Sequence, residues 1–555
     1  MNDAFAQYQA LYSQYRWLVP TRFNIAEACC RRWAENAAEA RRIAVFAEEA
    51  DGARDIWTFE RLYQTANRLS HGLLRMGLQR GDRVAVILPQ RGEALAAQFA
   101  IQQAGAVHVP LSPQLAPDAL EARLRDSEAH IAIVDASSRI TLATILHRCP
   151  ALQQIIGIGF ADEHTLAWRS LLARQEDRFT PVDTAATDPA LLLYTAGTTG
   201  PPRGALHAHA ALIGALPGFV AGQDWFPQGG DSLWSAFDWA SPGGLLGGVL
   251  PTLYFGRPLL AAQGRITPAR TLELLGRYRI RCAVLSPSLL AGLMQADIPL
   301  GAPLALRSIM CTGDPLDPAV NAWCARVLGV QPNEMFGQAE TGFVLGNSRH
   351  KWPVRPGSLG LPIPGHRVEV IDEHGAPAAT GEIGELAVHR LDPAGEPDPA
   401  MFLRYWGQDE NATPAAWVRT GDLARRDADG YLWHEGRAED VFRADGHRIG
   451  PGNIENWLRH HPAVAAAAIV PKPDAAHGAI VKAYVVLAPT YVGQAQSYLV
   501  EALQNHARER LAPYENPQEI EFVDTLPTSA TGAIQRGVLR QRERDRAARR
   551  SRGVR

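Results

Sequence analysis

The sequence predicts an α/β protein with a large N-terminal domain and a small α+β C-terminal domain. The chain has 555 residues, which is more than a single hydrophobic core usually fills. Helical and strand-like patterns alternate from residue 58 to about residue 350, and this alternation is typical of mixed or parallel sheets that are covered by helices. We therefore expect ligands to bind near the carboxyl ends of the strands, where the loops gather.

The alternation is clearest in the first segments. Residues 58–77 have apolar residues at intervals of three and four and end at a glycine, which predicts a helix. Residues 83–89 form a short apolar run that ends at a proline, which predicts a buried strand. A helix over 92–105 and a strand over 106–111 follow, and the pattern returns around 281–314.

The pattern changes after residue 350 and again near residue 440. Short strands separated by glycines over about 350–436 predict a small β-rich subdomain within an N-terminal domain that spans 1–436. We place the domain boundary at 437–440 and predict a separate α+β domain over 441–555. The basic residues at its end are interpreted as a solvated helix end rather than as an interaction arm.

Composition narrows the class of protein. Hydrophobic content of 46%, charged content of 20% and a net charge of −3 are ordinary for a soluble enzyme and do not favour nucleic acid. No signal sequence and no membrane span is predicted, and the six cysteines lack metal-ligand spacing. We expect reduced cysteines in a cytoplasmic protein, and the sequence does not distinguish a monomer from a homodimer.

Residues 191–209, LLLYTAGTTGPPRGALHAH, predict a phosphate-binding loop after a strand. Glycines let backbone N–H groups turn toward an anion, threonines add hydroxyl donors, and Arg203 supplies a fixed positive charge. The loop is not a Walker A motif, because G-x-x-x-x-G-K-[ST] has no match. We expect His207 and His209, which follow on a predicted helix, to pack or cap rather than to bind a metal.

Four further motifs follow in the chain: EMFGQAET at 334–341, VRTGDL at 418–423, GRAEDVFRADGHRIGPGNIE at 436–455 and LPTSATGAIQR at 526–536. Together with the loop, they resemble the adenylate-forming superfamily, and within it the acetyl-CoA and medium-chain acyl-CoA synthetase branch. The resemblance implies that a carboxylate attacks the α-phosphate of ATP and releases pyrophosphate, after which coenzyme A displaces AMP. It implies ATP, Mg²⁺ and coenzyme A as cofactors.

The resemblance also implies roles for single residues. Arg203 and Glu340 are expected to be catalytic, with Glu340 as the magnesium-linked glutamate. Asp422 is expected to accept the ribose hydroxyls, and Arg437 to contact ribose or phosphate as a further catalytic residue. The full nucleotide-binding set is Thr195, Gly197, Thr198, Thr199, Gly200, Gly313, Asp314, Pro315, Glu334, Met335, Phe336, Gln338, Asp422 and Arg437.

The C-terminal motifs imply movement and thiol transfer. Glu439 is expected to be the hinge about which the C-terminal domain rotates between the half-reactions. Gly446, His447 and Arg448 are expected to contact coenzyme A. The family lysine of the last motif is replaced by Ala533, and loss of one preorganised transition-state contact typically costs roughly 10²–10³ in rate.

The replacement at 533 is interpreted as a deliberate inactivation, with a natural loss of the lysine as the open alternative. Only Lys351, Lys472 and Lys482 are lysines among 55 basic residues, so natural drift in this chain favours arginine, as at Arg203. Three smaller departures from the family pattern remove hydroxyls: Ala196 stands for serine, Phe336 stands for tyrosine, and Ala339 stands for threonine. Thr341 would replace the last of these only if its side chain pointed the right way. We expect a chain that is impaired in adenylation.

The acyl pocket is predicted at 234–248 with Gly337. Trp239, Ser241 and Gly337 make this lining neutral and roomy, and Asp238 is expected to cap a helix rather than face the pocket. This predicts a short- to medium-chain, branched or aromatic carboxylate. Three alternatives stay open: a peptide-synthetase adenylation module, for which no carrier domain is expected, a fatty acyl-AMP ligase, and a non-catalytic nucleotide- or acyl-binding relative.

Overall fold

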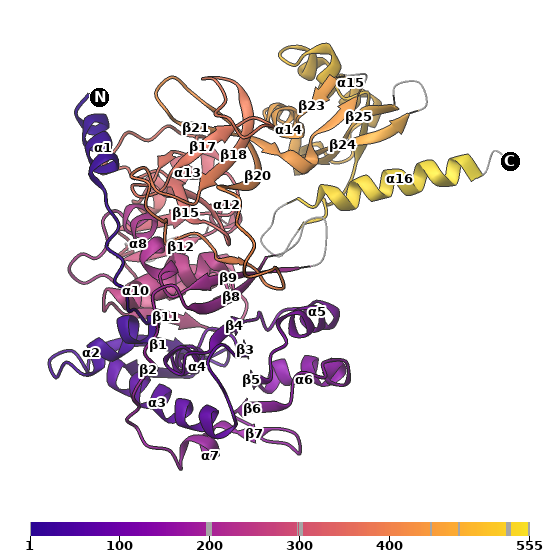
Figure 1. Ribbon diagram of the computed structural model, residues 1–555. Helices are drawn as coiled ribbons and strands as arrows, with labels where there is room; N and C mark the ends of the chain where they lie inside the picture. The colour runs from indigo at the N-terminus through magenta and orange to yellow at the C-terminus, as the bar shows by residue number, and fades with distance from the viewer. Residues whose placement is uncertain are drawn as a thin grey trace. The chain divides into compact units, whose positions relative to one another are not determined.

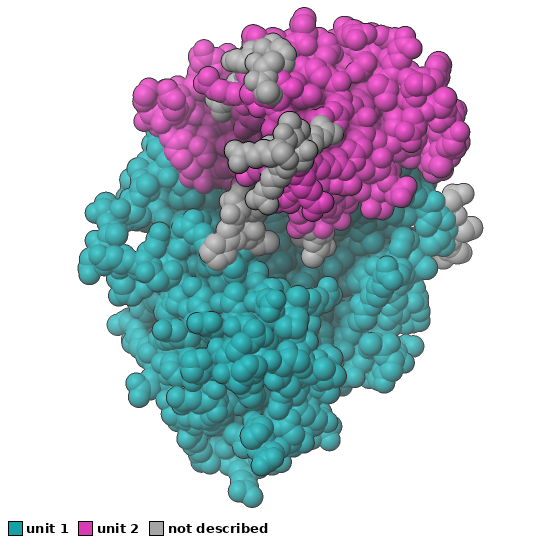
Figure 2. Space-filling view, turned by 90° about the vertical axis from the view of Figure 1, so that its right-hand side faces the viewer, with its two compact units in different colours: residues 1–368, 388–418 teal, residues 369–387, 419–555 magenta. Residues whose placement is uncertain are grey.

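The computed structural model describes residues 2–195, 202–296, 298, 304–444, 447–474, 478–528 and 534–552. Contacts divide the chain into two units, which Figure 2 colours separately. Unit 1 comprises Met1–Val368 and Val388–Val418, and unit 2 comprises Glu369–Ala387 and Arg419–Arg555. Each unit is described by itself below.

Unit 1 is built on two mixed sheets (Figure 1). Both have a parallel centre with antiparallel strands at an edge, which fits the predicted mixed or parallel sheets. Among the described residues, the first sheet has the order β19 (Arg404–Tyr405), β9 (Arg203–Ala208), β8 (Pro189–Thr195), β4 (Val107–Pro110), β3 (Arg83–Ile87), β5 (Ile131–Asp135), β6 (Gln154–Ile158) and β7 (Leu166–Ala167). The second has the order β16 (Leu361–Pro362), β15 (Gly342–Gly346), β14 (Asn333–Gln338), β13 (Ser308–Cys311), β12 (Cys282–Leu285), β10 (Leu233–Ser235), β11 (Leu259–Ala262), β1 (Ile43–Glu48) and β2 (Arg54–Thr58).

Helices connect and cover these strands. The predicted helix at 58–77 is α3 (Phe59–Arg75), whose N-cap Thr58 accepts a hydrogen bond from the Arg61 backbone N–H. The other helical segments of unit 1 are α1 (Asn2–Gln14), η1 (Glu27–Arg31), α2 (Arg32–Ala34), α4 (Gly92–Gln103), α5 (Pro117–Ser127), α6 (Ala136–Ile145), η2 (Leu146–Arg148), α7 (Trp168–Leu172), α8 (Ala211–Gly222), α9 (Pro242–Gly244), η3 (Leu245–Val249), α10 (Leu250–Tyr254), α11 (Pro268–Arg277), α12 (Pro287–Ala296), α13 (Pro318–Trp323) and η4 (Cys324–Leu328). No described helix is both long enough and apolar enough to cross a bilayer.

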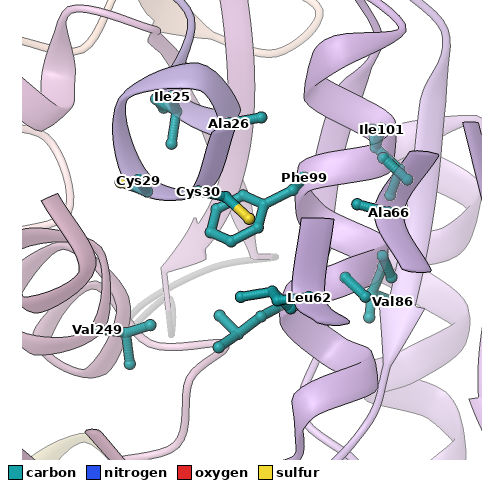
Figure 3. Close-up of a cluster of buried hydrophobic side chains, with 14 of the residues drawn as sticks. Ile25, Ala26, Cys29, Cys30, Leu62, Ala66, Val86, Phe99, Ile101 and Val249 are labelled. Atoms are coloured by element: carbon teal, nitrogen blue, oxygen red, sulfur yellow. The ribbon is translucent and has the colours of Figure 1, made fainter. Parts of the chain in front are cut away.

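The strand side chains alternate between two cores. Val84 and Val86 of β3 belong to one buried cluster, while Ala85 and Ile87 belong to another on the opposite face. The first cluster also takes buried side chains from β1, β11, α3 and α4, and Figure 3 shows part of it around Phe99 and Leu62. A sheet buried on both faces explains why its strands read as nearly continuous apolar runs.

Unit 2 holds smaller sheets. Its strands are β17 (Val368–Ile371), β18 (Ile383–His389), β20 (Trp417–Arg426) and β21 (Leu432–Arg437) in one sheet, the hairpin of β22 (Phe442–Ala444) and β23 (His447–Ile449), and β24 (Val464–Asp474), β25 (Gly478–Leu487) and β26 (Glu519–Phe522) in another. The helices are α14 (Pro451–Arg459), α15 (Gln496–Arg508) and α16 (Arg536–Arg552), with the single turns η5 (Ala438–Asp440), η6 (Pro489–Tyr491) and η7 (Pro513–Glu515).

The division at 368 and 418 groups the strands of 419–437 with the C-terminal residues. The predicted boundary at 437–440 concerns a pivot of motion, so it stays a prediction. One local expectation was wrong: His207 lies in β9 and His209 in the turn that follows, so neither is on a helix. The reason is pairing, because β9 folds back antiparallel on β8 with Leu191 opposite His207.

Candidate active site

The two ends of the predicted phosphate loop are adjacent. Thr195 is the last residue of β8 and pairs with Arg203, the first residue of β9. The Thr195 hydroxyl donates to the Arg203 carbonyl oxygen at 3.4 Å. The loop residues between them, Gly197, Thr198, Thr199 and Gly200, lie outside the described residues. The hairpin of β8 and β9 therefore brings Arg203 beside the end of the strand that enters the loop.

Arg203 and Glu340 meet on the side chain of Tyr405. The Arg203 guanidinium carbon lies 3.4 Å from the centroid of the Tyr405 ring. The Tyr405 hydroxyl donates to Glu340 Oε1 at 2.8 Å. Burial, with the neighbouring Glu340 charge, raises the pKa of the Tyr405 hydroxyl, so the phenol remains a donor at neutral pH. Two charges predicted to act on the phosphates thus share one phenol, which the sequence analysis had not selected.

The charged ends of this group are open. Within the described ranges, Glu340 Oε2 accepts no hydrogen bond and the Arg203 guanidinium donates none. A carboxylate oxygen suits a hard cation, and a guanidinium suits phosphate oxygens. No cluster of three or more His, Cys, Asp or Glu side chains able to hold a metal occurs in the described part of the chain.

The predicted adenine loop is tied to β14 by Glu334. Its carboxylate accepts a hydrogen bond from the Leu316 backbone N–H at 2.9 Å, directly after Asp314 and Pro315. Gly313 has φ +113° and open space where a Cβ would lie, so this turn favours glycine. Burial raises the pKa of Glu334 to about 7, against the lowering effect of the Leu316 hydrogen bond.

The rest of β14 divides its side chains between core and surface. Met335 is buried and fills the space beside Gly222 and Gly346, so its side chain belongs to the core. Phe336 and Gln338 are partly exposed. The Thr341 hydroxyl is buried, accepts from the Gln338 N–H at 3.3 Å and donates to the Gly342 carbonyl at 3.2 Å. Thr341 therefore does not replace the hydroxyl that is missing at Ala339.

The predicted acyl-pocket residues have clear local roles. Ser241 caps α9 by accepting from the Gly244 N–H at 3.1 Å. The Asp238 carboxylate accepts from the Ala240 N–H at 2.9 Å in the turn before α9, and Ser241, not Asp238, is the N-cap of that helix. Trp239 is buried, and its indole N–H has no acceptor among the described residues.

Gly337 is glycine for a packing reason. A Cβ at this position would lie 2.0 Å from the Gly342 carbonyl oxygen on the neighbouring β15. The close approach of these two strands excludes any side chain at 337, whatever the acyl substrate. The role of Gly337 in an acyl pocket stays a prediction. Backbone packing alone accounts for glycine at this position, so the missing side chain is no sign of space for a longer acyl chain.

Within unit 2, three predicted residues form one charged chain. Asp422 on β20 and Arg437 on β21 are cross-strand partners, with Arg437 donating to the Asp422 carboxylate at 2.8 Å. His434 Nε2 lies 3.1 Å from the same carboxylate, and Arg437 Nε lies 3.8 Å from Glu439. The charged chain therefore ends at the predicted hinge.

The predicted coenzyme A segment is described in part. Gly446 lies outside the described residues, and of Arg448 only the backbone, paired with Arg443, is described. His447 is exposed and stacks on Tyr514, with ring centroids 4.1 Å apart and 9° between planes. Ala533 also lies outside the described residues.

Comparison with known proteins identifies the family. The AMP-binding enzyme family matches residues 30–394, and the AMP-binding enzyme C-terminal domain matches residues 453–533. The chain belongs to the AMP-binding enzyme family. It is 33% identical to the uncharacterized acyl-CoA ligase YtcI of Bacillus subtilis, over 91% of this chain and 94% of that protein. It is 32% identical to the mitochondrial acyl-coenzyme A synthetase ACSM4 of Rattus norvegicus, over 95% and 92% of the two chains.

Solved structures of similar fold are acyl-CoA ligases and synthetases as well. The anthranilate CoA ligase AuaEII in complex with anthranoyl-AMP is 26% identical, with a TM-score of 0.83 over 96% of this chain and 99% of that one. A Brucella canis acyl-CoA synthetase is 30% identical, with a TM-score of 0.72 over 98% and 99%. The chain is an acyl-CoA synthetase of the adenylate-forming superfamily, as its motifs predicted, and use of ATP and coenzyme A follows from that membership.

Several contacts of the synthetase escaped sequence reasoning. Tyr405 lies in a two-residue strand, and His434 lies on β21 just before the motif that begins at residue 436. The one available signal was the RYW run at 404–406, because aromatic residues beside a strand end often pack on charged groups.

Proposed function

We propose that this chain is an AMP-forming synthetase that joins a short- to medium-chain, branched or aromatic carboxylic acid to coenzyme A through an acyl-adenylate. The observation that carries the proposal is the meeting of Arg203 and Glu340 on Tyr405, at the strand that leaves the phosphate loop. A fixed cation and an open carboxylate at one place suit the phosphates of ATP and their Mg²⁺. When bound, Mg²⁺ neutralises phosphate charge.

The other roles follow the motif positions. We assign the adenine to the turn of Gly313, Asp314 and Pro315, which Glu334 anchors. Asp422 would accept the ribose hydroxyls, with Arg437 holding its carboxylate in place. Glu439 would be the pivot and His447 would contact coenzyme A, so the second half-reaction belongs to the β22–β23 hairpin.

The choice of acid rests on the neutral segment 234–248. Its one acid, Asp238, accepts the Ala240 N–H within its own turn, which favours a local structural role over pairing with the ammonium group of an amino-acid substrate. The structural relative that holds anthranoyl-AMP is a reason to test aromatic acids. All six cysteines are buried and free, which suits the reducing cytoplasm that we propose for this enzyme.

The decisive experiment measures pyrophosphate release from ATP and Mg²⁺ with acids from acetate to dodecanoate and with benzoate. It compares this chain with its Ala533→Lys variant, in which the family lysine is restored. We expect the variant to form adenylate roughly 10²–10³ times faster, because the lysine would contact developing charge in the transition state. Adding coenzyme A should then convert the adenylate to acyl-CoA.

The outcomes separate the alternatives. A strong preference for acetate would contradict the proposed pocket. Release of free acyl-AMP that coenzyme A does not consume would favour a fatty acyl-AMP ligase. ATP binding without adenylate, even with lysine at 533, would favour a non-catalytic relative.

A further inference from the structure

Tyr405 stands between two opposite charges that would otherwise pair. Arg203 and Glu340 both contact its side chain, yet no ion pair joins them among the described residues. A guanidinium and a carboxylate that approach freely form a bidentate pair. Such a pair would occupy both carboxylate oxygens and the donors of the arginine, leaving neither group open to a ligand.

We infer that Tyr405 is a positioning residue of the MgATP site, whose ring face holds Arg203 and whose hydroxyl holds Glu340, so that both charges stay directed at the phosphates. The inference rests on the proposed roles of Arg203 and Glu340 in ATP binding. Tyr405 thus makes a separate contact with each charge: its ring with Arg203 and its hydroxyl with Glu340.

The backbone around Tyr405 is fixed by the strand that carries Arg203. Tyr405 pairs with Ala205 of β9, and the Trp406 N–H donates to the Gly204 carbonyl at 2.7 Å. The ring position relative to Arg203 is therefore set by β-sheet hydrogen bonds only two residues from the arginine.

The same segment also fixes Glu340. The Phe402 N–H donates to the Glu340 carbonyl oxygen at 2.9 Å, and the Phe402 ring packs on the Tyr405 ring at 4.8 Å between centroids. Residues 402–406 thus hydrogen-bond to the Glu340 backbone at one end and to the β9 backbone at the other. A side chain held this way loses little freedom when a ligand binds, which is the basis of preorganisation.

The hydroxyl contact with Glu340 and the ring contact with Arg203 can be removed in two steps. Tyr405→Phe keeps the ring under Arg203 and deletes only the donor to Glu340. Tyr405→Leu deletes both. If Glu340 serves the cation and Arg203 serves the phosphate, the first variant should lose magnesium-dependent affinity only, and the second should lose affinity with or without magnesium.

The test is ATP binding by the full chain, measured by calorimetry with excess Mg²⁺ and again with EDTA. For Tyr405→Phe we expect ATP affinity to fall about tenfold with Mg²⁺ and to stay unchanged in EDTA, because one hydrogen bond to a charged group is lost. Tyr405→Leu should lower affinity in both buffers. Tyr498→Phe, at an exposed tyrosine, is the matched control and should bind as the parent does.

A double variant tests whether the Tyr405 hydroxyl acts through the Glu340 carboxylate. Adding Tyr405→Phe to Glu340→Gln should lower the affinity no further than Glu340→Gln alone, since the hydroxyl acts through that carboxylate. Equal losses with and without Mg²⁺, or no loss in Tyr405→Phe at an unchanged melting temperature, would overturn the inference while leaving the proposed function intact. A parent chain that binds no ATP would overturn both.

Discussion

Replacing Glu334 with glutamine is expected to stabilise the protein increasingly as the pH rises. The Glu334 side chain is largely buried, and its pKa is raised from 4.5 to about 7 by that burial. The folded state therefore holds a proton that the unfolded chain releases, so stability falls as pH rises from 4.5 to about 7. Glutamine cannot ionise, and its carbonyl oxygen can still accept the Leu316 N–H.

The magnitude follows from the two pKa values. Each pKa unit corresponds to about 1.4 kcal/mol, so the ionised carboxylate costs roughly 3 kcal/mol once the pH exceeds the folded pKa. At pH 5.5 the gain from Glu334→Gln should be about 1.5 kcal/mol, rising to about 3 kcal/mol at pH 8. The rise with pH identifies the cause, because a change in packing alone would not depend on pH.

Urea denaturation of the parent and the variant at both pH values measures this difference. Glu163→Gln is the control, since Glu163 is exposed in the same unit, and its substitution should change nothing at either pH. A Glu334→Gln variant that is equally stable relative to the parent at pH 5.5 and 8, or less stable at pH 8, would refute the reasoning. It would mean that the folded protein stabilises the carboxylate.

Two further predictions test packing and charge. Gly337→Ala should lower the free energy of unfolding by about 1–3 kcal/mol or prevent folding, because its Cβ would lie 2.0 Å from backbone. Gly243→Ala is the control and should be tolerated, because no atom lies nearer than 3.9 Å to its Cβ. Melting temperatures of the two variants and the parent compare these effects. Arg536→Ala should destabilise unit 2 by about 3–5 kcal/mol, because it leaves the buried Glu455 carboxylate without an arginine partner and leaves Asp440 paired with Arg540 alone. Arg542→Ala, at a half-exposed arginine, should cost less than about 1 kcal/mol in the same urea titration, and equal losses would contradict the burial argument.

The cluster around Arg536 links parts of unit 2 that the sequence separates. Arg536 donates to Glu455 of α14 at 2.6 Å and to Asp440, next to the predicted hinge, at 3.1 Å. Within the last motif, the Gln535 N–H donates to the Pro527 carbonyl at 2.8 Å. The described residues on either side of position 533 are therefore joined to each other and, through Arg536, to Asp440 in η5.

Composition shows that lysine is scarce in this chain but does not explain why a particular position keeps a lysine. The sequence revealed that arginine replaces lysine almost everywhere, without a reason for the exceptions. In the structure, Lys482 is fully buried, and its ammonium lies within 3.0 Å of the Glu519, Glu521 and Glu543 carboxylates. A compact ammonium with three donors suits three converging acceptors better than a planar guanidinium does.

Local pattern determined much of this protein by itself. Helix and strand periodicity, glycine stops and motif order predicted the α/β class, the strand before the phosphate loop and the residue types for nucleotide chemistry. These are properties of short segments, so the sequence contains them directly. His207 shows the limit, because its strand depends on pairing with β8 rather than on its own residues.

Only the tertiary structure decided which residues share a site. Arg203, Glu340 and Tyr405 come together because β9 pairs with β19 and because the Phe402 N–H binds the Glu340 carbonyl. Gly337 is glycine because β15 passes too close for any side chain. Contacts of this kind depend on the order in which distant strands pair, and no local pattern encodes that order.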